Sequence, residues 1–367
     1  MNEPGDILAA RDALVGWLLD RALPLWWDVG ADLERGGFHD SLDGAARPIA
    51  GPQRVRIQAR QVFSYRRAGQ LGWRGPWRAA MDHGLAALDG RFRRPDGLYR
   101  SWSGVEEGDD AVDLYDQAFV LLALAQVHDE GDVAVRAAAL LERLPVEPAG
   151  GFAEFTGEAR LANPNMHLFE SALAWTEAAG AGPWRPMAAG QARLAAAHLI
   201  DPATGAVSEV FGPGWKGPRA AGERRVEPGH QFEWAWLLMR WSLAAGDAAA
   251  LAAALRLIEI GETCGVDPVR NVAVNALDGE LKPTDTGTRL WPQAERLRAH
   301  LLAGALTKDP ACWELAVKAA EGLTNFLEPS GLWRDSLETQ DAPAPASSLY
   351  HIVGAAWQLD QTAKGLL

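Results

Sequence analysis

A glycine-containing segment recurs six times along this chain of 367 residues. Each copy supplies glycine for a turn, followed by alternating apolar and polar residues, the pattern of a short hairpin strand. Consecutive copies lie roughly 50 to 75 residues apart, which leaves room for two helices between them. We interpret the copies as connectors, which are GGFHD at 36, DGLYRSW at 96, GGFAEF at 150, GAVSEVF at 205, DGELK at 278 and GLWRDS at 331.

The segments between the connectors have helical periodicity. They are rich in Ala, Leu, Arg and Glu, with apolar residues three and four positions apart, as in residues 111–130 and 234–260. Six helical hairpins could stack as an open solenoid or close into a ring. The number six and the connectors favour the ring. We therefore predict an all-α fold, a single (α/α)6-barrel domain over residues 1–367 with short β-hairpin connectors.

Charge and cysteine content limit the classes of partner. The formal net charge of -13 and the pI near 5.1 argue against nucleic acid and anionic membranes, whose phosphates need a basic patch. The two cysteines, Cys264 and Cys312, form no CxxC pair. The N-terminus lacks the pattern of a signal peptide, and no apolar stretch approaches the length of a membrane span. We expect a cytoplasmic monomer or homodimer that acts on a small neutral molecule.

A polar cluster opens the helix that follows each connector. If alternate helices form an inner ring, these six helix starts converge at one end of the barrel around a single pocket. The clusters are QARQVF with Arg60, YDQAF with Tyr115 and Asp116, NPNMHLFE with Asn163 and His167, PGHQFE with His230, WPQAE with Trp291 and Glu295, and SSLYH with Ser347 and His351.

Three of these clusters carry a histidine in or near the first helical turn, where the positive end of the helix dipole disfavours the imidazolium. We therefore expect His167, His230 and His351 to be neutral proton acceptors. The pattern His-x-Phe-Glu places Glu170 and Glu233 one turn further along, where each could orient its histidine. The chain has neither HxH nor HExxH, and it has no phosphate loop, so we predict no metal and no cofactor.

Several of these motifs, in the same order, resemble those of the N-acylglucosamine 2-epimerase superfamily. The resemblance runs from about residue 26 to residue 357. The superfamily has an (α/α)6 barrel and includes N-acylglucosamine 2-epimerases, cellobiose 2-epimerases, mannose isomerases and sulfoquinovose isomerases. The matching segments are QAR at 58–60, YDQAF at 115–119, NPNMHLFESALAW at 163–175, GHQFEWAWLL at 229–238, WPQAE at 291–295 and YH at 350–351.

The resemblance implies roles for individual residues. His351 and His230 would be the acid/base pair that opens the sugar ring and transfers the C2 proton, without a metal, through a cis-enediol. Return of the proton to C1 would give a ketose, and return to the other face of C2 would give the epimer. The residues expected to bind the sugar are Arg60, Tyr115, Asn163, His167, Glu233 and Trp291.

The last motif separates the branches of the superfamily. Cellobiose epimerases carry a tryptophan five residues before the final histidine, where this chain has Ala346. The form PASSLYH resembles mannose isomerases, which implies conversion of D-mannose to D-fructose. The alternatives are 2-epimerisation, isomerisation of a phosphorylated or sulfonated sugar that Arg224 and Arg225 would meet, glycoside hydrolysis by two carboxylates, and sugar binding without catalysis.

Overall fold

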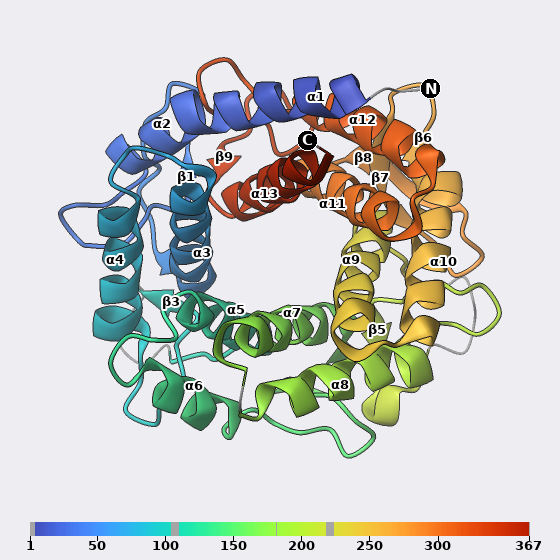
Figure 1. The fold of residues 1–367 in the computed structure, drawn as a ribbon. Coiled ribbons are helices and arrows are strands. Elements are labelled where there is room, and N and C mark those ends of the chain that lie inside the picture. Colours follow the sequence, from blue (N-terminus) through green and yellow to red (C-terminus); the bar gives the residue numbers. More distant parts are fainter. Residues whose placement is uncertain (1–3, 104–109, 181, 218–223, 367) are drawn as a thin grey trace.

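The computed structural model describes residues 4–103, 110–180, 182–217 and 224–366, so the first three residues of the N-terminus lie outside the described part. Two concentric rings of helices form the molecule (Figure 1), which confirms the predicted (α/α)6 barrel. In the described residues the inner ring consists of α3 (Val55–Leu71), α5 (Leu114–Ala125), α7 (Ala162–Ala179), α9 (Pro228–Ala245), α11 (Leu290–Thr307) and α13 (Ser348–Leu366).

The inner ring is closed, because each inner helix contacts the next and α13 contacts α3. An outer helix covers each inner one, and short π-helical turns at Leu18–Ala22, Leu88–Phe92 and Ala195–Leu199 extend three of the outer helices. The outer helices are α1 (Pro4–Trp17) with α2 (Leu23–Asp28), α4 (Trp77–Ala87), α6 (Val133–Leu141), α8 (Trp184–Leu194), α10 (Ala248–Gly265) and α12 (Pro310–Thr324).

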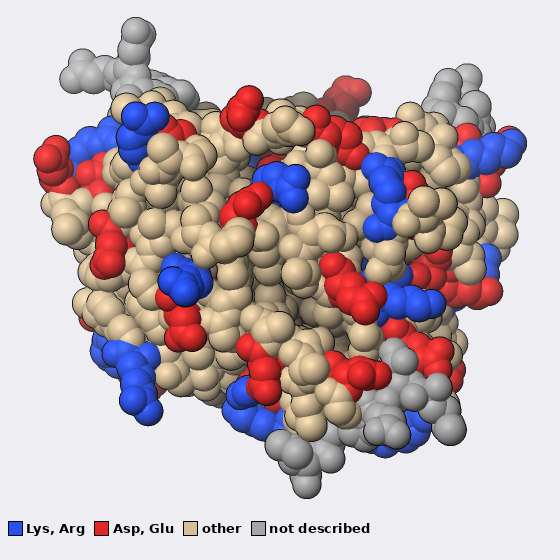
Figure 2. Space-filling view, turned by 90° about the horizontal axis from the view of Figure 1, so that it is seen from above, with Lys and Arg blue, Asp and Glu red and all other residues tan. Residues whose placement is uncertain are grey.

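Tryptophans fill the space between the two rings. A Cβ atom on the inner-ring residue Gly69 would lie 2.5 Å from the ring of Trp77, and one on Gly304 would lie 2.9 Å from the ring of Trp313. Glycine at these positions therefore lets an outer tryptophan pack directly on an inner helix. No described helix is long and apolar enough to cross a membrane. Acidic and basic side chains are interspersed on the face shown in Figure 2.

Short strands join the connectors of neighbouring repeats. β2 (Gln53–Arg54) pairs with β3 (Trp102–Ser103), and β4 (Arg160–Leu161) pairs with β5 (Val210–Phe211), both antiparallel. The first and last connectors meet in the same way, because β1 (Ser41–Leu42) pairs with β9 (Ala344–Pro345). The strands therefore help to close the ring.

Five of the six predicted turns lie where expected. Each is closed by an antiparallel bridge, namely Ala31 with Phe38, Arg93 with Tyr99, Val146 with Phe152, Ile200 with Val207, and Leu327 with Trp333.

The assignment of DGELK as the connector turn of the fifth repeat was wrong. In that repeat the equivalent turn spans residues 268–271, between β6 (Val266–Asp267) and β7 (Val272–Leu277). DGELK instead joins β7 to β8 (Pro283–Thr288), an additional hairpin. The Asp-Gly signal marked a real hairpin turn, but one that is inserted into the repeat.

A buried amide at the start of an inner helix fixes the connector before it. Gln231 accepts a hydrogen bond from the Val207 N–H at 2.8 Å and donates to the Val207 carbonyl at 3.0 Å. The same amide donates to the Glu227 carbonyl at its own helix start. Equivalent pairs join Gln58 to Phe38, Gln117 to Tyr99, Asn165 to Phe152, and Gln293 to Ala273. We call these five residues the amide clamps.

Candidate active site

A cavity of about 370 Å³ opens at the end of the barrel where the inner helices begin. This volume lies within the range of small-molecule sites. All eight residues predicted to form the site line it, and every inner helix contributes at least one. They are Arg60 on α3, Tyr115 on α5, Asn163 and His167 on α7, His230 and Glu233 on α9, Trp291 on α11, and His351 on α13.

His230 forms an ion pair that was not predicted. Its Nδ1 lies 2.9 Å from Oε2 of Glu209 and 3.6 Å from Oε2 of Glu227. Burial lowers the pKa of His230, but the charge and hydrogen bond of Glu209, together with the charge of Glu227, outweigh burial and raise it to about 10. The prediction of a neutral ring was therefore wrong for His230, because a connector carboxylate outweighs the helix dipole.

The partner of His230 is itself deeply buried. Burial raises the pKa of Glu209, and the imidazolium of His230 opposes that rise. Glu209 Oε1 is buried and forms no hydrogen bond with the described residues. The pair as a whole therefore keeps its proton at pH values where an ordinary histidine has lost it.

His351 also hydrogen-bonds to a carboxylate, but it is neutral. Its Nδ1 lies 2.7 Å from Oε1 of Glu295. Arg298 Nη1 donates hydrogen bonds to both oxygens of Glu295, at 2.9 Å to Oε1 and 2.7 Å to Oε2. Burial lowers the pKa of His351 well below its usual range, and the charge of Arg60 lowers it further. The predicted neutral state is confirmed here. Because Nδ1 bonds to Glu295, Nε2 is the ring nitrogen available to a ligand in the cavity.

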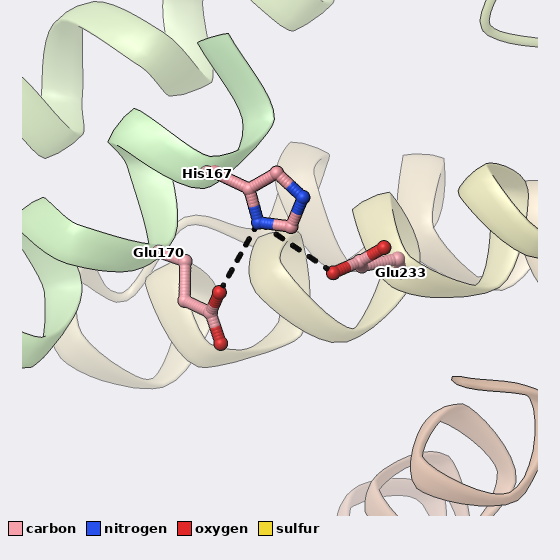
Figure 3. Close-up of side chains that lie close together, drawn as sticks. All are labelled: His167, Glu170 and Glu233. Carbon is pink, nitrogen blue, oxygen red and sulfur yellow. Dashed lines mark hydrogen bonds and ion pairs between the residues drawn. The ribbon is translucent and has the colours of Figure 1, made fainter. Parts of the chain in front are cut away.

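His167, Glu170 and Glu233 lie close together (Figure 3), and His167 and Glu233 line the cavity. Nδ1 of His167 is 3.4 Å from Glu170 and 3.8 Å from Glu233. Burial lowers the pKa of His167 to about 4, although Glu170 opposes the shift, so this ring is neutral as predicted. Glu170 orients His167, as the sequence suggested, whereas Glu233 lies beside His167 rather than orienting His230.

Glu233 is a buried carboxyl group without a hydrogen-bonding partner. Neither of its oxygens forms a hydrogen bond with the described residues. Burial raises its pKa well above the usual range, and the charges of Glu295 and Glu170 raise it further. The raised pKa favours the neutral form of Glu233, whose hydroxyl can donate a hydrogen bond to a ligand. Asn163 Oδ1 is also buried without a partner, so it offers an acceptor.

Aromatic and cationic side chains form the remaining wall. The Trp291 ring contacts both histidines expected to act as acid and base, with its centroid 4.8 Å from that of His230 and 5.7 Å from that of His351. Arg60 donates to the Tyr115 hydroxyl, and its guanidinium lies 4.2 Å from the Phe119 ring centroid. Arg60 is thereby held against the cavity.

The two arginines considered for an anionic substituent behave differently. Arg224 pairs with Asp201, away from the cavity, whereas Arg225 lines the cavity and donates to Glu227 at 2.7 Å. Arg289, which the sequence did not single out, also lines it and lies 3.4 Å from Asp335.

Histidine and carboxylate atoms come within 4.8 Å of one another in two groups, namely His167 with Glu170 and Glu233, and Glu233 with Glu295 and His351. Arg298 approaches Glu170 to 3.5 Å and donates two hydrogen bonds to Glu295. Since Arg298 supplies a positive charge to both groups, we assign no metal to either.

Sequence analysis missed Glu209 and Arg298. The strand alternation in GAVSEVF does put Glu209 on the face opposite Ser208 and Val210. That alternation could have flagged the carboxylate as buried, but not against which helix. Arg298 lies one turn after Glu295 on a helix buried on nearly every side, so the signal was a pair of opposite charges within a buried run.

Comparisons with known proteins agree with this geometry. Residues 36–355 match the model of the family described as N-acylglucosamine 2-epimerase. A mannose-6-phosphate isomerase of Rhizobium meliloti (strain 1021) is 39% identical, covering 98% of this chain and 99% of the relative. A D-mannose isomerase of Thermobifida fusca is 29% identical over 74% of each chain.

Solved structures share the fold. A D-mannose isomerase structure superposes with a TM-score of 0.86 at 19% identity, covering 95% of this chain and 98% of the other. A cellobiose 2-epimerase from Spirochaeta thermophila DSM 6192 gives a TM-score of 0.85 at 19% identity over 98% of each chain. From the family match and its relatives, the chain belongs to the N-acylglucosamine 2-epimerase family and is a mannose isomerase-like sugar isomerase or epimerase.

Proposed function

We propose that this protein is an aldose–ketose isomerase that converts D-mannose to D-fructose without a metal. The observation that carries the proposal is a pair of histidines with opposite protonation states, both in contact with the ring of Trp291. His230 holds a proton and His351 holds a free lone pair, which are the acid and the base that proton transfer through an enediol requires.

The proposed reaction begins with ring opening. The imidazolium of His230 donates a proton to the ring oxygen while the O1 hydroxyl releases its proton to solvent, which gives the open-chain aldose. Nε2 of His351 then removes the C2 proton as the protonated carboxyl group of Glu233 donates its proton to O1, which gives the cis-enediol. His351 returns its proton to C1 while the O2 hydroxyl returns a proton to Glu233, which leaves the ketose, and His230 takes up a proton from solvent. Glu233 can stabilise the charge that develops on O1, because its neutral carboxyl group lies beside both histidine clusters.

The other predicted residues would bind and orient the sugar. Trp291 offers an apolar face to the C–H groups of a pyranose, and Asn163 offers an unpaired acceptor to a hydroxyl. Arg60, Tyr115 and His167 lie on the opposite wall, where Arg60 and Tyr115 are already joined by a hydrogen bond. A site prepared in this way loses little entropy when the sugar binds.

Isomerisation of D-mannose 6-phosphate is the second candidate. It is favoured by Arg225 and Arg289 at the cavity and by the name of the Rhizobium meliloti relative. Both arginines already have a carboxylate partner, and Glu209 adds a further acidic group to the cavity. This balance of charge favours the free sugar. Hydrolysis is less consistent with the site, since Asp116 is held by Arg56 at 2.6 Å.

The test is a substrate panel with EDTA-treated protein. We expect D-mannose to give D-fructose with a higher kcat/KM than D-mannose 6-phosphate, N-acetylmannosamine or cellobiose, and His351→Ala to abolish turnover. A higher kcat/KM with the phosphosugar would make the second candidate the function. Glucose as the main product would identify a 2-epimerase, and activity restored only by added metal would contradict the mechanism.

A further inference from the structure

We propose that Arg298 is a positioning residue that decides which of the two histidines acts as the base. This inference rests on the proposed function, and it goes beyond it by explaining why two similar histidine–carboxylate pairs behave differently. Arg298 lies on α11 and is 2% exposed. Arg298 does not line the active-site cavity, so it would act through the residues to which it is bound.

The two pairs have nearly the same hydrogen bond. Nδ1 of His230 lies 2.9 Å from Glu209, and Nδ1 of His351 lies 2.7 Å from Glu295. They differ in what else the carboxylate contacts. Glu209 has one buried oxygen that forms no hydrogen bond with the described residues, whereas Glu295 accepts two hydrogen bonds from Arg298. Burial raises the pKa of both carboxyl groups, and at Glu295 the charge and hydrogen bonds of Arg298 oppose that rise and favour the carboxylate.

Arg298 determines which ring nitrogen of His351 carries the hydrogen, in addition to its effect on the charge of the ring. Arg298 stabilises Glu295 as a carboxylate, which can accept the Nδ1–H of a neutral imidazole. The lone pair of His351 is then on Nε2, facing the substrate. If the His351–Glu295 pair carried one more proton, either His351 would be an imidazolium, or a protonated Glu295 would donate to Nδ1 and move the ring hydrogen to Nε2. In both cases the base would be lost.

The other charged groups around His351 either lower its pKa, as Arg298 does, or are carboxylates paired with another group. Arg60 on α3 and Arg298 itself lower the pKa of His351, and Glu170 on α7 raises it. Arg298 approaches Glu170 to 3.5 Å, and the hydroxyl of Tyr350 on α13 donates to the same carboxylate. His167 on α7 is neutral, and the raised pKa of Glu233 on α9 favours its neutral form. Arg298 therefore compensates both carboxylates that would otherwise charge His351.

A second cavity makes Arg298 accessible to a chemical probe. It has a volume of about 150 Å³ and lies toward the C-terminal ends of the inner helices, where Arg67, Arg240 and Arg298 line it. The guanidinium of Arg298 lies 3.7 Å from the Trp236 ring centroid, and that of Arg240 lies 4.4 Å from the same centroid. Truncation of Arg298 would leave a guanidinium-sized space that joins this cavity, so free guanidinium can replace the lost group.

The experiment compares Arg298→Ala and Arg298→Lys with Arg240→Ala as the matched control. Arg240 packs on the same tryptophan but binds Glu177, which has no contact with either histidine pair. For each variant, kcat/KM for the sugar turned over by the wild type is measured against pH, with and without guanidinium at concentrations that do not unfold the protein. The titration of the His351 ring is followed by NMR with labelled histidine, which requires no activity.

We expect Arg298→Ala to lower kcat/KM at pH 7 by about 100-fold and to move the acidic limb of the profile to higher pH. Guanidinium should restore about a tenth or more of the lost activity, and the NMR titration of His351 should move upward. Arg298→Lys should show a smaller shift in the same direction, which tests the idea even if Arg298→Ala does not fold. Arg240→Ala should keep the wild-type profile.

The inference would be overturned if Arg298→Lys, and Arg298→Ala where it folds, kept both the acidic limb of the pH profile and the titration of His351 unchanged. So would equal effects of Arg298→Ala and Arg240→Ala. Failure of the proposed function looks different, because the wild type would then lack isomerase activity or His351→Ala would retain it, while the NMR titration would still report on Arg298.

Discussion

In the described residues, five of the six inner helix starts have two polar faces, one with an amide clamp and one that lines the cavity, and the two faces differ in how completely their atoms are paired. Gln231 faces the connector, where its amide makes three hydrogen bonds to backbone atoms. One residue earlier, His230 faces the cavity, where the buried oxygens of Glu209, Glu233 and Asn163 include several with no partner in the described residues. A buried polar atom without a hydrogen bond lowers the stability of the folded protein, so these atoms indicate the face at which a ligand would supply the missing hydrogen bonds.

Within each sequence motif, this comparison separates residues that stabilise the fold from residues that line the cavity. In QAR, Gln58 clamps Phe38 and Arg60 lines the cavity. In YDQAF, Gln117 clamps Tyr99 and Tyr115 lines the cavity. Substitutions on the cavity face should therefore remove activity and leave the fold intact, whereas substitutions of the clamps should do the reverse.

The largest effect is expected for His351→Ala, which removes the proposed base. The variant should lose about 1,000-fold in kcat, because general-base catalysis contributes 10² to 10⁴. Its melting temperature should stay near that of the wild type, since the ring has one hydrogen bond in the protein. Steady-state kinetics and thermal denaturation measure the two effects. Activity within 10-fold of the wild type would show that another group is the base.

Gln117→Leu removes one of the amide clamps of the inner helices. It leaves the buried N–H and C=O of Tyr99 unpaired, so the free energy of unfolding should fall by about 3 kcal/mol. Chemical denaturation measures this loss, and the folded fraction should keep kcat within a few-fold. Tyr115→Phe is the matched variant on the same helix, and it should lower activity about 10-fold with little loss of stability. If both variants lose only activity, the division into two faces is wrong.

The pH dependence of kcat/KM tests the charge states of the two histidines. The base His351 must be neutral, and its lowered pKa places the acidic limb below the ordinary histidine value. The acid His230 must be protonated, so the alkaline limb should lie near its pKa of about 10. Glu209→Gln removes the carboxylate charge and should move the alkaline limb toward about 6.5, costing about 10-fold in rate per pH unit above it. An unmoved alkaline limb would show that His230 is not the acid.

The smallest effect is expected for Arg225→Ala. Arg225 is paired with Glu227 at the rim, so its loss should change kcat/KM for D-mannose by less than about 3-fold. Arg224→Ala is the control, since Arg224 pairs with Asp201 away from the cavity. A large loss with D-mannose 6-phosphate, confined to Arg225→Ala, would instead support the phosphosugar as substrate.

Much of this arrangement was predictable because it follows from local pattern. The recurring glycine turns and the helical periodicity between them predicted the barrel, and the polar helix starts pointed to eight of the residues that line the cavity. The fifth turn was misplaced, because an inserted hairpin carries the same Asp-Gly signal as a connector.

Sequence reasoning could not supply the partners of the histidines. Glu209 reaches His230 from 21 residues away, and Glu295 reaches His351 from 56 residues away. These distances depend on ring closure and on strand pairing between connectors, which no local pattern encodes. The charge of His230 followed from Glu209, so the helix dipole alone gave the wrong sign. Nor could the motifs separate clamps from ligand contacts, since both lie in the first helical turns.

The most direct test of the central claim is to incubate the metal-free protein with D-mannose in D2O and to follow the products by NMR. Histidine-mediated transfer through an enediol predicts D-fructose that carries deuterium at C1 and that forms about 1,000-fold more slowly with His351→Ala. D-fructose without any deuterium, in an amount unaffected by His351→Ala, would contradict the account, because the hydrogen would then have moved without passing through an exchangeable base.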